Sequence, residues 1–304
     1  MLGIGGMGAY AQQQPIYTQY MFNMLTINPA YAGSHDVLGV TALYRKQWVG
    51  IPGAPQTTII GADMPANQNW LGLGLQLFTD KIGVENTSGL VSSYAFRMHL
   101  FTTEDEFAIG VQAGLSNFKA DYTQVDLINN YDPSFAGNIV NAWLPSLGGG
   151  FYYHNDEFYI GLSSPNLLTS SLKNKSIVTQ SAVSAKLTSH FFFTTGYEFA
   201  LSDNLQLKPS ILVKAVAGAP IQSDVNMNLW IDDKLSVGAS YRTGDAIAAM
   251  VEVNITSQFK IGYSYEKSIS NLGQFSQGTH ELMLHYELVP PDGEKKYYLH
   301  PRHF

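Results

Sequence analysis

The sequence predicts an all-β fold: a transmembrane outer-membrane antiparallel β-barrel of about 14 strands. Three observations support this fold class. Charged residues make up only 13% of the chain, against roughly 25% in soluble domains. Apolar residues alternate with small or polar ones through most of the sequence, as in strands with one oily face. Short and long connections between these segments also alternate, as in bacterial membrane barrels.

The composition excludes several classes of function. The 304 residues include no cysteine, which rules out disulfide scaffolds, thiolate zinc sites and cysteine nucleophiles. The formal net charge is −7 and no basic tract occurs, so no nucleic-acid partner is expected. No run of about 18 residues lacks polar interruption, as a membrane-spanning helix would require. A barrel stays compatible because its strands alternate between lipid and lumen.

The first element along the chain is a short leader. Residues 1–11 are apolar and end in Ala9-Tyr10-Ala11, the small-x-small form of a signal-peptidase site, which predicts a signal-peptide remnant. Gly3 to Gly8 also match the G-x-G-x-x-G dinucleotide fingerprint. That motif needs a preceding strand, and only two residues precede Gly3, so we discard it.

Residues 37–289 are predicted to form one barrel domain, because no repeat or linker divides them. The alternation is clearest in residues 71–78, where leucines occupy the odd positions. Fourteen strands are predicted, at residues 37–49, 57–65, 71–79, 88–100, 107–118, 144–153, 158–163, 187–199, 205–215, 224–231, 235–242, 246–255, 259–266 and 279–289.

The connections between these strands fall into two sets. Tight polar turns are predicted at residues 65–70, 102–106, 154–157, 200–204, 232–234 and 256–258. The longest of the other connections are 117–143, 164–186 and 267–278. Outer-membrane barrels have short periplasmic turns and longer external loops, and an even strand number returns both ends to the periplasm. We therefore expect residues 12–36 to form a periplasmic or plug segment and the tail 290–304 to lie in the periplasm.

Charged side chains on the predicted strands fall on the parity opposite the oily residues, so we expect them to face the lumen. A lipid-facing Arg or Lys near the bilayer midplane costs roughly 2–4 kcal/mol. Lys46 is the exception, at a strand end where it can snorkel. The predicted lumen charges include Arg45, Asp63, Arg97, Glu198, Lys208, Lys214, Arg242, Glu252, Lys260, Glu266, Glu281 and Glu287.

Motifs for catalysis or metal binding are weak, and we expect a non-enzymatic protein without a cofactor or metal ion. His280 and His285 flank one residue too many for H-E-x-x-H, and on a strand they point to opposite faces. Ser170 and Lys173 match S-x-x-K without the partner motifs of serine acylases. The other histidines, His35 among them, are scattered, and solvated or lumen-facing positions explain them better than ligation does.

The segment before the first strand is unusually aromatic, since residues 14–34 read QPIYTQYMFNMLTINPAYAGS. Together with YRKQWVG at 44–50 and GAPQT at 53–57, it resembles the opening of the PorP/SprF family of type IX secretion membrane proteins. Later segments agree in the same order and extend the match over nearly the whole chain after the leader. They are DKIG at 80–83, YRTGDA at 241–246, IGYSY at 261–265 and GTHEL at 278–282.

This resemblance implies an outer-membrane protein of Bacteroidota-type bacteria, tied to type IX export and, in many members, to gliding motility. Members are associated with the periplasmic ring lipoprotein of the machine, or with surface attachment of secreted adhesins that carry a type B C-terminal sorting domain. The resemblance supplies no catalytic residues. An outer-membrane porin or a hydrophobic-substrate transport channel is the main alternative, and an outer-membrane enzyme is a third.

Two regions are candidates for function. Residues 15–34 carry apolar side chains at roughly helical spacing, which predicts a plug in the barrel mouth; an extension that docks on a partner is the alternative. The long connections 117–143 and 164–186 either bind a partner or fold over the barrel top; Tyr and Trp favour an interface. The candidate residues are Tyr17, Tyr20, Phe22, Asn28, Pro29, Tyr31, Tyr122, Tyr131, Phe135 and Trp143.

Overall fold

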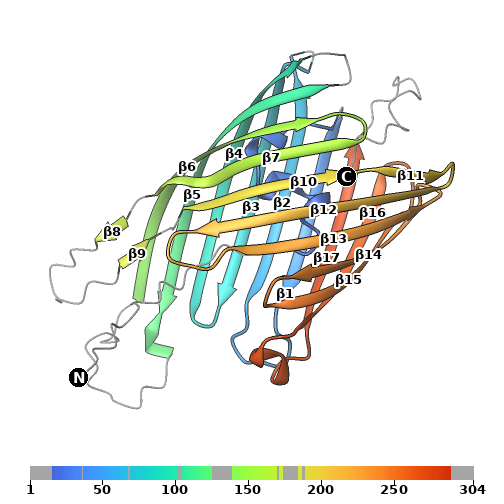
Figure 1. Ribbon diagram of the computed structural model, residues 1–304. Helices are drawn as coiled ribbons and strands as arrows, with labels where there is room; N and C mark the ends of the chain where they lie inside the picture. The colour runs from blue at the N-terminus through green and yellow to red at the C-terminus, as the bar shows by residue number, and fades with distance from the viewer. Residues whose placement is uncertain are drawn as a thin grey trace, which may run out of the picture.

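The chain forms a single closed antiparallel β-barrel (Figure 1). The computed structural model describes residues 16–35, 37–67, 69–100, 105–124, 139–169, 171–173, 184–186 and 189–288. Among these residues, no helix is long and apolar enough to cross a membrane.

Fourteen strands build the barrel wall, which confirms the fold predicted from the alternation. They are β1 (Leu38–Lys46), β2 (Gln56–Ala66), β3 (Leu71–Ile82), β4 (Glu85–His99), β5 (Glu106–Asp121), β6 (Ile139–His154), β7 (Phe158–Thr169), β10 (His190–Tyr197), β12 (Leu205–Val216), β13 (Gln222–Ile231), β14 (Leu235–Arg242), β15 (Ala246–Asn254), β16 (Phe259–Ser268) and β17 (Thr279–Leu288). Short β11 (Phe199–Ser202) continues β10 along the edge of β12.

The first and last strands close the barrel against each other. β1 and β17 pair in one unbroken register from Leu38 opposite Leu288 to Lys46 opposite His280. Every other neighbour in the wall is also antiparallel, and β10 bridges β7 and β12. In the described part of the chain, each wall strand is therefore paired with a neighbour on both sides, which closes the barrel and satisfies backbone groups that would otherwise face lipid.

The two rims differ in their connections, as the sequence predicts. One rim carries short turns, such as Asp232–Lys234 between β13 and β14, where Asp232 and Asp233 both have positive φ (52° and 53°). This is the type I′ geometry that favours Asp for backbone reasons. Residues 38 and 288 lie at this short-turn end, which is the periplasmic end in outer-membrane barrels. The opposite rim carries the long connections, together with short turns at residues 83–84 and 243–245.

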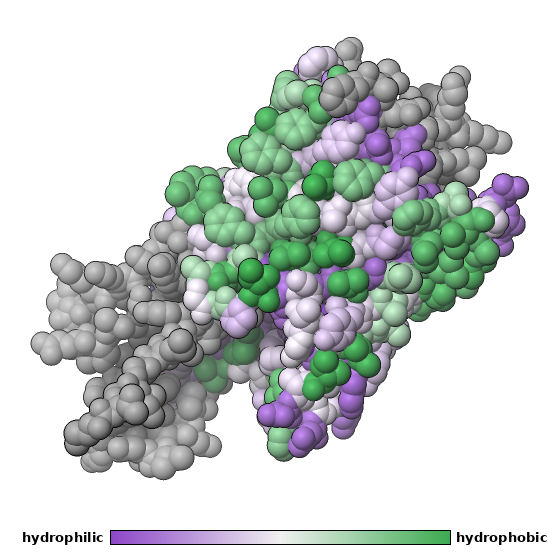
Figure 2. All heavy atoms as spheres, viewed as in Figure 1, coloured by the Kyte–Doolittle hydropathy of each residue, from purple (hydrophilic) through white to green (hydrophobic). Residues whose placement is uncertain are grey.

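The alternation separates an oily outside from a charged inside. Leu75 and Leu77 on β3 are exposed, whereas Gln76 between them is buried in the lumen. Figure 2 shows apolar side chains over much of one outer face of the barrel. The predicted lumen charges all lie on the inner side: each is less than 9% exposed except Lys260, whose side chain is 18% exposed. Lys46 lies outside, at the last position of β1.

Exposed aromatic residues lie near both rims. Trp70 and Phe199 lie near the short-turn end, and Trp143 and Tyr241 lie towards the long connections. All four are roughly half exposed on the outer face. This arrangement matches the two interfacial girdles of outer-membrane barrels.

Several strands are longer than the alternation predicts, mostly at the long-connection rim. β5 reaches Asp121 and β6 begins at Ile139, so the predicted connection 117–143 is shorter. Lys119 and Asn141 face each other in the added ladder and are exposed. Polar residues outside the lipid zone carry no hydropathy signal, which explains the error. Within predicted connection 164–186, β7 continues to Thr169 and β8 (Ser171–Lys173) pairs with β9 (Ser184–Lys186).

Candidate functional site

Residues 16–35, which we call the lumen segment, lie inside the barrel (Figure 1). At one end, Tyr17 packs on Leu43 and Ile59 in the part of the wall near the long connections. At the other end, the backbone N–H of Gly33 donates to Asp63 near the short turns. The segment therefore runs along the lumen from the long-connection end to the short-turn end. All its residues are buried except Phe22, which is partly buried.

The lumen segment is not one amphipathic helix. It consists of three single turns of 3₁₀ helix: η1 (Tyr20–Phe22), η2 (Met24–Thr26) and η3 (Pro29–Tyr31). The Asn28 side chain accepts from the N–H of Ala30 and so caps η3, whose first residue is Pro29. Both are favoured roles for these residue types. Side chains contact the barrel on all sides, so a helix with one polar face has no advantage here.

Glycines on the inner wall let the lumen segment approach the strands closely. A Cβ at Gly72 on β3 would lie 1.7 Å from the carbonyl oxygen of Ala32, and one at Gly110 on β5 would lie 2.2 Å from the nitrogen of Ala30. These are backbone atoms, which cannot rotate away. Any side chain at either position therefore has to displace the segment.

Replacing Gly72 or Gly110 with alanine is expected to destabilise the barrel. The added methyl group collides with the segment's backbone, and overpacking of this kind typically lowers the free energy of unfolding by about 1–3 kcal/mol. Urea unfolding of the purified barrel measures the loss. Gly61→Ala is the matched control, because its Cβ would lie 3.5 Å from the Gln76 side chain, an ordinary contact. Equal midpoints for all three variants would contradict close segment packing.

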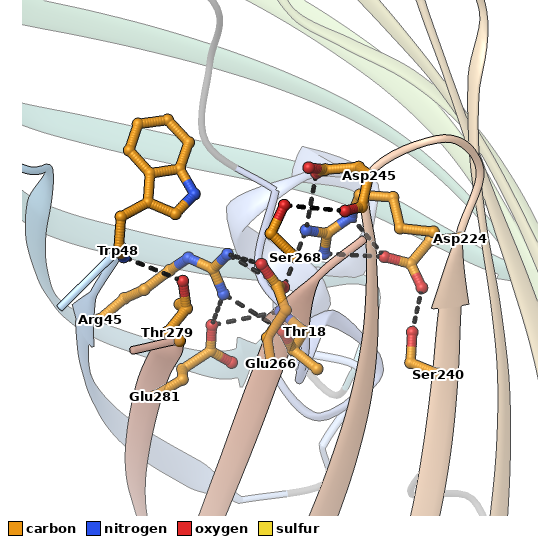
Figure 3. Close-up of polar contacts among 12 residues, drawn as sticks. Thr18, Arg45, Trp48, Asp224, Ser240, Asp245, Glu266, Ser268, Thr279 and Glu281 are labelled. Atoms are coloured by element: carbon orange, nitrogen blue, oxygen red, sulfur yellow. Dashed lines mark hydrogen bonds and ion pairs between the residues drawn. The ribbon is translucent and has the colours of Figure 1, made fainter. Parts of the chain in front are cut away.

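A buried ion-pair network holds the first part of the lumen segment (Figure 3). Arg45 Nη1 lies 2.9 Å from Glu281 Oε2, and Arg45 Nη2 lies 3.2 Å from Glu266. Thr18 joins this network, since its hydroxyl accepts from Arg45 and donates to Glu266. The backbone N–H groups of Thr18 and Gln19 both donate to the Glu281 carboxylate, at 3.2 and 2.8 Å.

Arg242 extends this network along the wall. Its guanidinium donates to Glu266 at 2.8 Å and to Asp224 at 2.9 Å. Ser240 also donates to Asp224. Strands β1, β13, β14, β16 and β17 thus contribute charges to one network that ends on the segment. Charges this deeply buried need partners, because an unpaired buried ion costs several kcal/mol.

Neutral hydrogen bonds hold the middle of the lumen segment. The hydroxyl of Tyr20 donates to Ser210 at 3.1 Å and accepts from Asn226 at 3.1 Å. Ser163 donates to the carbonyl of Ile27, and the Asn28 amide donates to the carbonyl of Phe151. The segment thus supplies hydrogen-bond partners for these buried polar groups of the wall.

Aromatic contacts and a second ion pair hold the last part. Tyr31 packs edge-to-face on Tyr152, with ring centroids 5.4 Å apart. Arg97 forms a two-point ion pair with Glu106, at 2.6 and 2.8 Å, and also donates to the carbonyl of Gly33. The carboxylates that contact the segment are thus engaged by Arg side chains or backbone N–H groups, an arrangement suited to holding a peptide.

The other predicted site residues fall into four groups. Glu252 and Lys260 lie in the lumen, where Lys260 pairs with Glu287 at 3.2 Å. Tyr122 begins the short turn η4 (Tyr122–Gln124), and its hydroxyl donates to Glu85. Burial and the nearby charge of Glu85 raise the pKa of Tyr122 to about 12, so this phenol stays protonated. Trp143 lies on β6 and points outward, away from the lumen. Tyr131 and Phe135 lie outside the described residues.

The sequence analysis did not identify Thr18 and Gln19, the lumen-segment residues that bond to the wall carboxylates, because aromatic residues dominate residues 14–34. One signal was present in the strands. Gly72, Gly74 and Gly110 occupy lumen-facing positions against the segment, and glycine in a strand interior often marks close approach of another backbone.

The fold and this site define a class: a 14-stranded outer-membrane barrel whose lumen holds its own N-terminal segment. The family model described as type IX secretion system membrane protein PorP/SprF matches residues 9–286. The chain therefore belongs to the PorP/SprF family. A comparison with curated proteins found no match.

Three similar solved structures are distant in sequence. A FadL homologue of Pseudomonas aeruginosa is 11% identical with a TM-score of 0.48, covering 90% of this chain and 94% of that chain. Omp33 of Acinetobacter baumannii is 11% identical with a TM-score of 0.47, covering 84% and 100%. The monoaromatic hydrocarbon channel CymD is 11% identical with a TM-score of 0.47, covering 94% and 96%.

Proposed function

We propose that this protein is a closed, non-enzymatic barrel of the type IX secretion apparatus that anchors a secreted surface protein in the outer membrane. One observation carries the proposal: the lumen is occupied by a segment of the same chain, held by a buried network of charges. A barrel filled in this way is suited to a scaffold. The client we expect is an adhesin that carries a type B C-terminal sorting domain, as the family resemblance implies.

The lumen chemistry also supports a non-enzymatic role. A general acid or base must be within reach of a substrate's proton. Glu281 and Glu266 are instead buried between Arg45 and the lumen segment, with side chains 0% and 5% exposed. Their hydrogen-bonding capacity is used by Thr18, Gln19 and arginine.

Affinity purification from the native outer membrane tests the proposed function. The tagged protein is extracted in mild detergent, and co-purifying proteins are identified by mass spectrometry. Recovery of a large surface adhesin supports anchoring. Recovery of a periplasmic ring lipoprotein moves the protein into the export machine, and a lone barrel that conducts ions favours the porin or hydrophobic-substrate channel.

A second experiment tests whether the client binds at the rim that carries the long connections. Residues 122–138 are replaced by a Gly/Ser linker of equal length, which removes Tyr122, Tyr131 and Phe135. We expect the client to be released from cells while the barrel still assembles and shows heat-modifiable mobility in gels. Retention of the client by this variant would contradict binding at this connection.

A further inference from the structure

Three potential metal ligands meet at the short-turn end of the lumen. His35 is the last described residue of the lumen segment, and His285 and Glu287 come from β17. One donor atom from each lies within 4.8 Å of the other two, and all three residues are buried. Positions 285 and 287 share the inner face of β17, whereas His280 has the opposite parity, is half-buried and bonds to Tyr263. The fold therefore brings together histidines that are 250 positions apart in the sequence.

The donor set fits a divalent transition metal. Two imidazoles and a carboxylate are typical zinc ligands, with bonds of about 2.0–2.2 Å. Ligands of a tetrahedral site with such bonds lie about 3.3–3.5 Å apart. His285 Nε2 and Glu287 Oε1 are 3.3 Å apart, which is this spacing. Asp63 adds a second carboxylate, with Oδ2 3.8 Å from His35 Nδ1.

The surroundings also orient one ligand. The Thr41 hydroxyl lies 2.8 Å from His285 Nδ1, which leaves Nε2 directed at Glu287. Metal-binding histidines commonly have their other ring nitrogen fixed in this way, and loss of the fixing group typically weakens metal affinity 10–100-fold. Lys260 disfavours metal binding, because its ammonium lies 3.2 Å from Glu287 Oε1 and competes with a metal cation for that carboxylate.

We propose that His35, His285 and Glu287 bind one divalent transition-metal ion, Zn²⁺ by ligand type, and that this ion fastens the lumen segment to β17 at the short-turn mouth of the barrel. The ion would link the segment directly to the strand that closes the barrel against β1. This inference is independent of the identity of the client protein.

Calorimetric titration with ZnCl₂ tests the site. The full-length protein carries no histidine tag and is dialysed against EDTA in detergent before titration. We expect one equivalent of Zn²⁺ to bind, at least tenfold more weakly in His35→Ala and in His285→Ala, and 10–100-fold more weakly in Thr41→Val. His154→Ala is the matched control, because His154 is also buried in the lumen but contacts Glu106 instead. Absent binding, or equal binding by all variants, would overturn the proposal.

Two further measurements distinguish a bound metal ion that holds the lumen segment to β17 from an ordinary cluster of charges. Zn²⁺ should raise the melting temperature of the wild type but not of His35→Ala. If binding is lost in His285→Ala but kept in His35→Ala, the ion does not link the lumen segment to β17, and this part of the proposal is wrong. Lys260→Gln should bind Zn²⁺ several-fold more tightly, because its competing ammonium is gone. Weaker binding by Lys260→Gln would contradict direct coordination by Glu287.

Discussion

Deleting residues 16–35 is expected to convert a silent barrel into an ion-conducting pore. Eight-stranded barrels are filled by their own side chains, whereas those with 16–18 strands leave an aqueous channel. With 14 strands, this barrel is closer to the second group. The lumen segment supplies the missing filling, and the wall behind it is polar, with Arg45, Glu266 and Glu281 among its side chains. Planar-bilayer recordings should therefore show discrete current steps only after the deletion.

A second variant separates occupancy of the lumen from specific docking. Residues 16–35 are replaced by a Gly/Ser sequence of equal length. This variant keeps a chain segment in the lumen but lacks the side chains that bond to the wall. We expect fluctuating current, because an unanchored chain leaves and re-enters the pore. Both variants must first show heat-modifiable mobility, so that an unfolded barrel is not scored. If the deletion variant stays silent, the lumen segment is not the barrier to ions.

The strands were predictable because the membrane penalises errors of register. A one-residue slip would place charges such as Arg97 or Glu252 against lipid, so charges in the middle of the strands stay on the lumen-facing parity. This is why all fourteen strands could be located from a single sequence. The predicted strand ends were wrong outside the oily zone, where the membrane no longer penalises a charged or polar side chain on the outer face. Lys119 and Asn141 extend β5 and β6 beyond the oily zone, where polar residues suit a strand and a loop equally well.

The candidate site was predictable only in part. The aromatic content of residues 15–34 indicated a packed segment, but the same content suits a partner-docking extension. The contacts that decide its position join Thr18 to Glu281 and Gly33 to Asp63. Thr18 and Glu281 are 263 positions apart, and no periodicity links them. Such contacts follow from which strands meet at β1 and β17, so they require the closed barrel.

Arg45→Ala is expected to produce the largest loss of stability among single substitutions in the lumen. The Arg45 side chain is 1% exposed and compensates Glu281 and Glu266. Removing one partner of a buried ion pair typically costs about 3–5 kcal/mol, because a buried charge is left uncompensated. Urea unfolding in liposomes measures this loss. Lys46→Ala is the control, since Lys46 is the next residue on β1 but exposed, and we expect a change within about 0.5 kcal/mol.

The double variant Arg45→Ala with Glu281→Gln identifies the cause of that loss. Arg242 pairs with Glu266 at 2.8 Å in the wild type, so we expect Glu281 to be the carboxylate left without a cation when Arg45 is removed. Its neutral amide equivalent removes the uncompensated charge, and the carbonyl oxygen of that amide can still accept from the N–H of Thr18 or Gln19. We therefore expect the double variant to be more stable than Arg45→Ala alone. If it is less stable, packing of the arginine side chain, and not its charge, accounts for the stability that Arg45 provides.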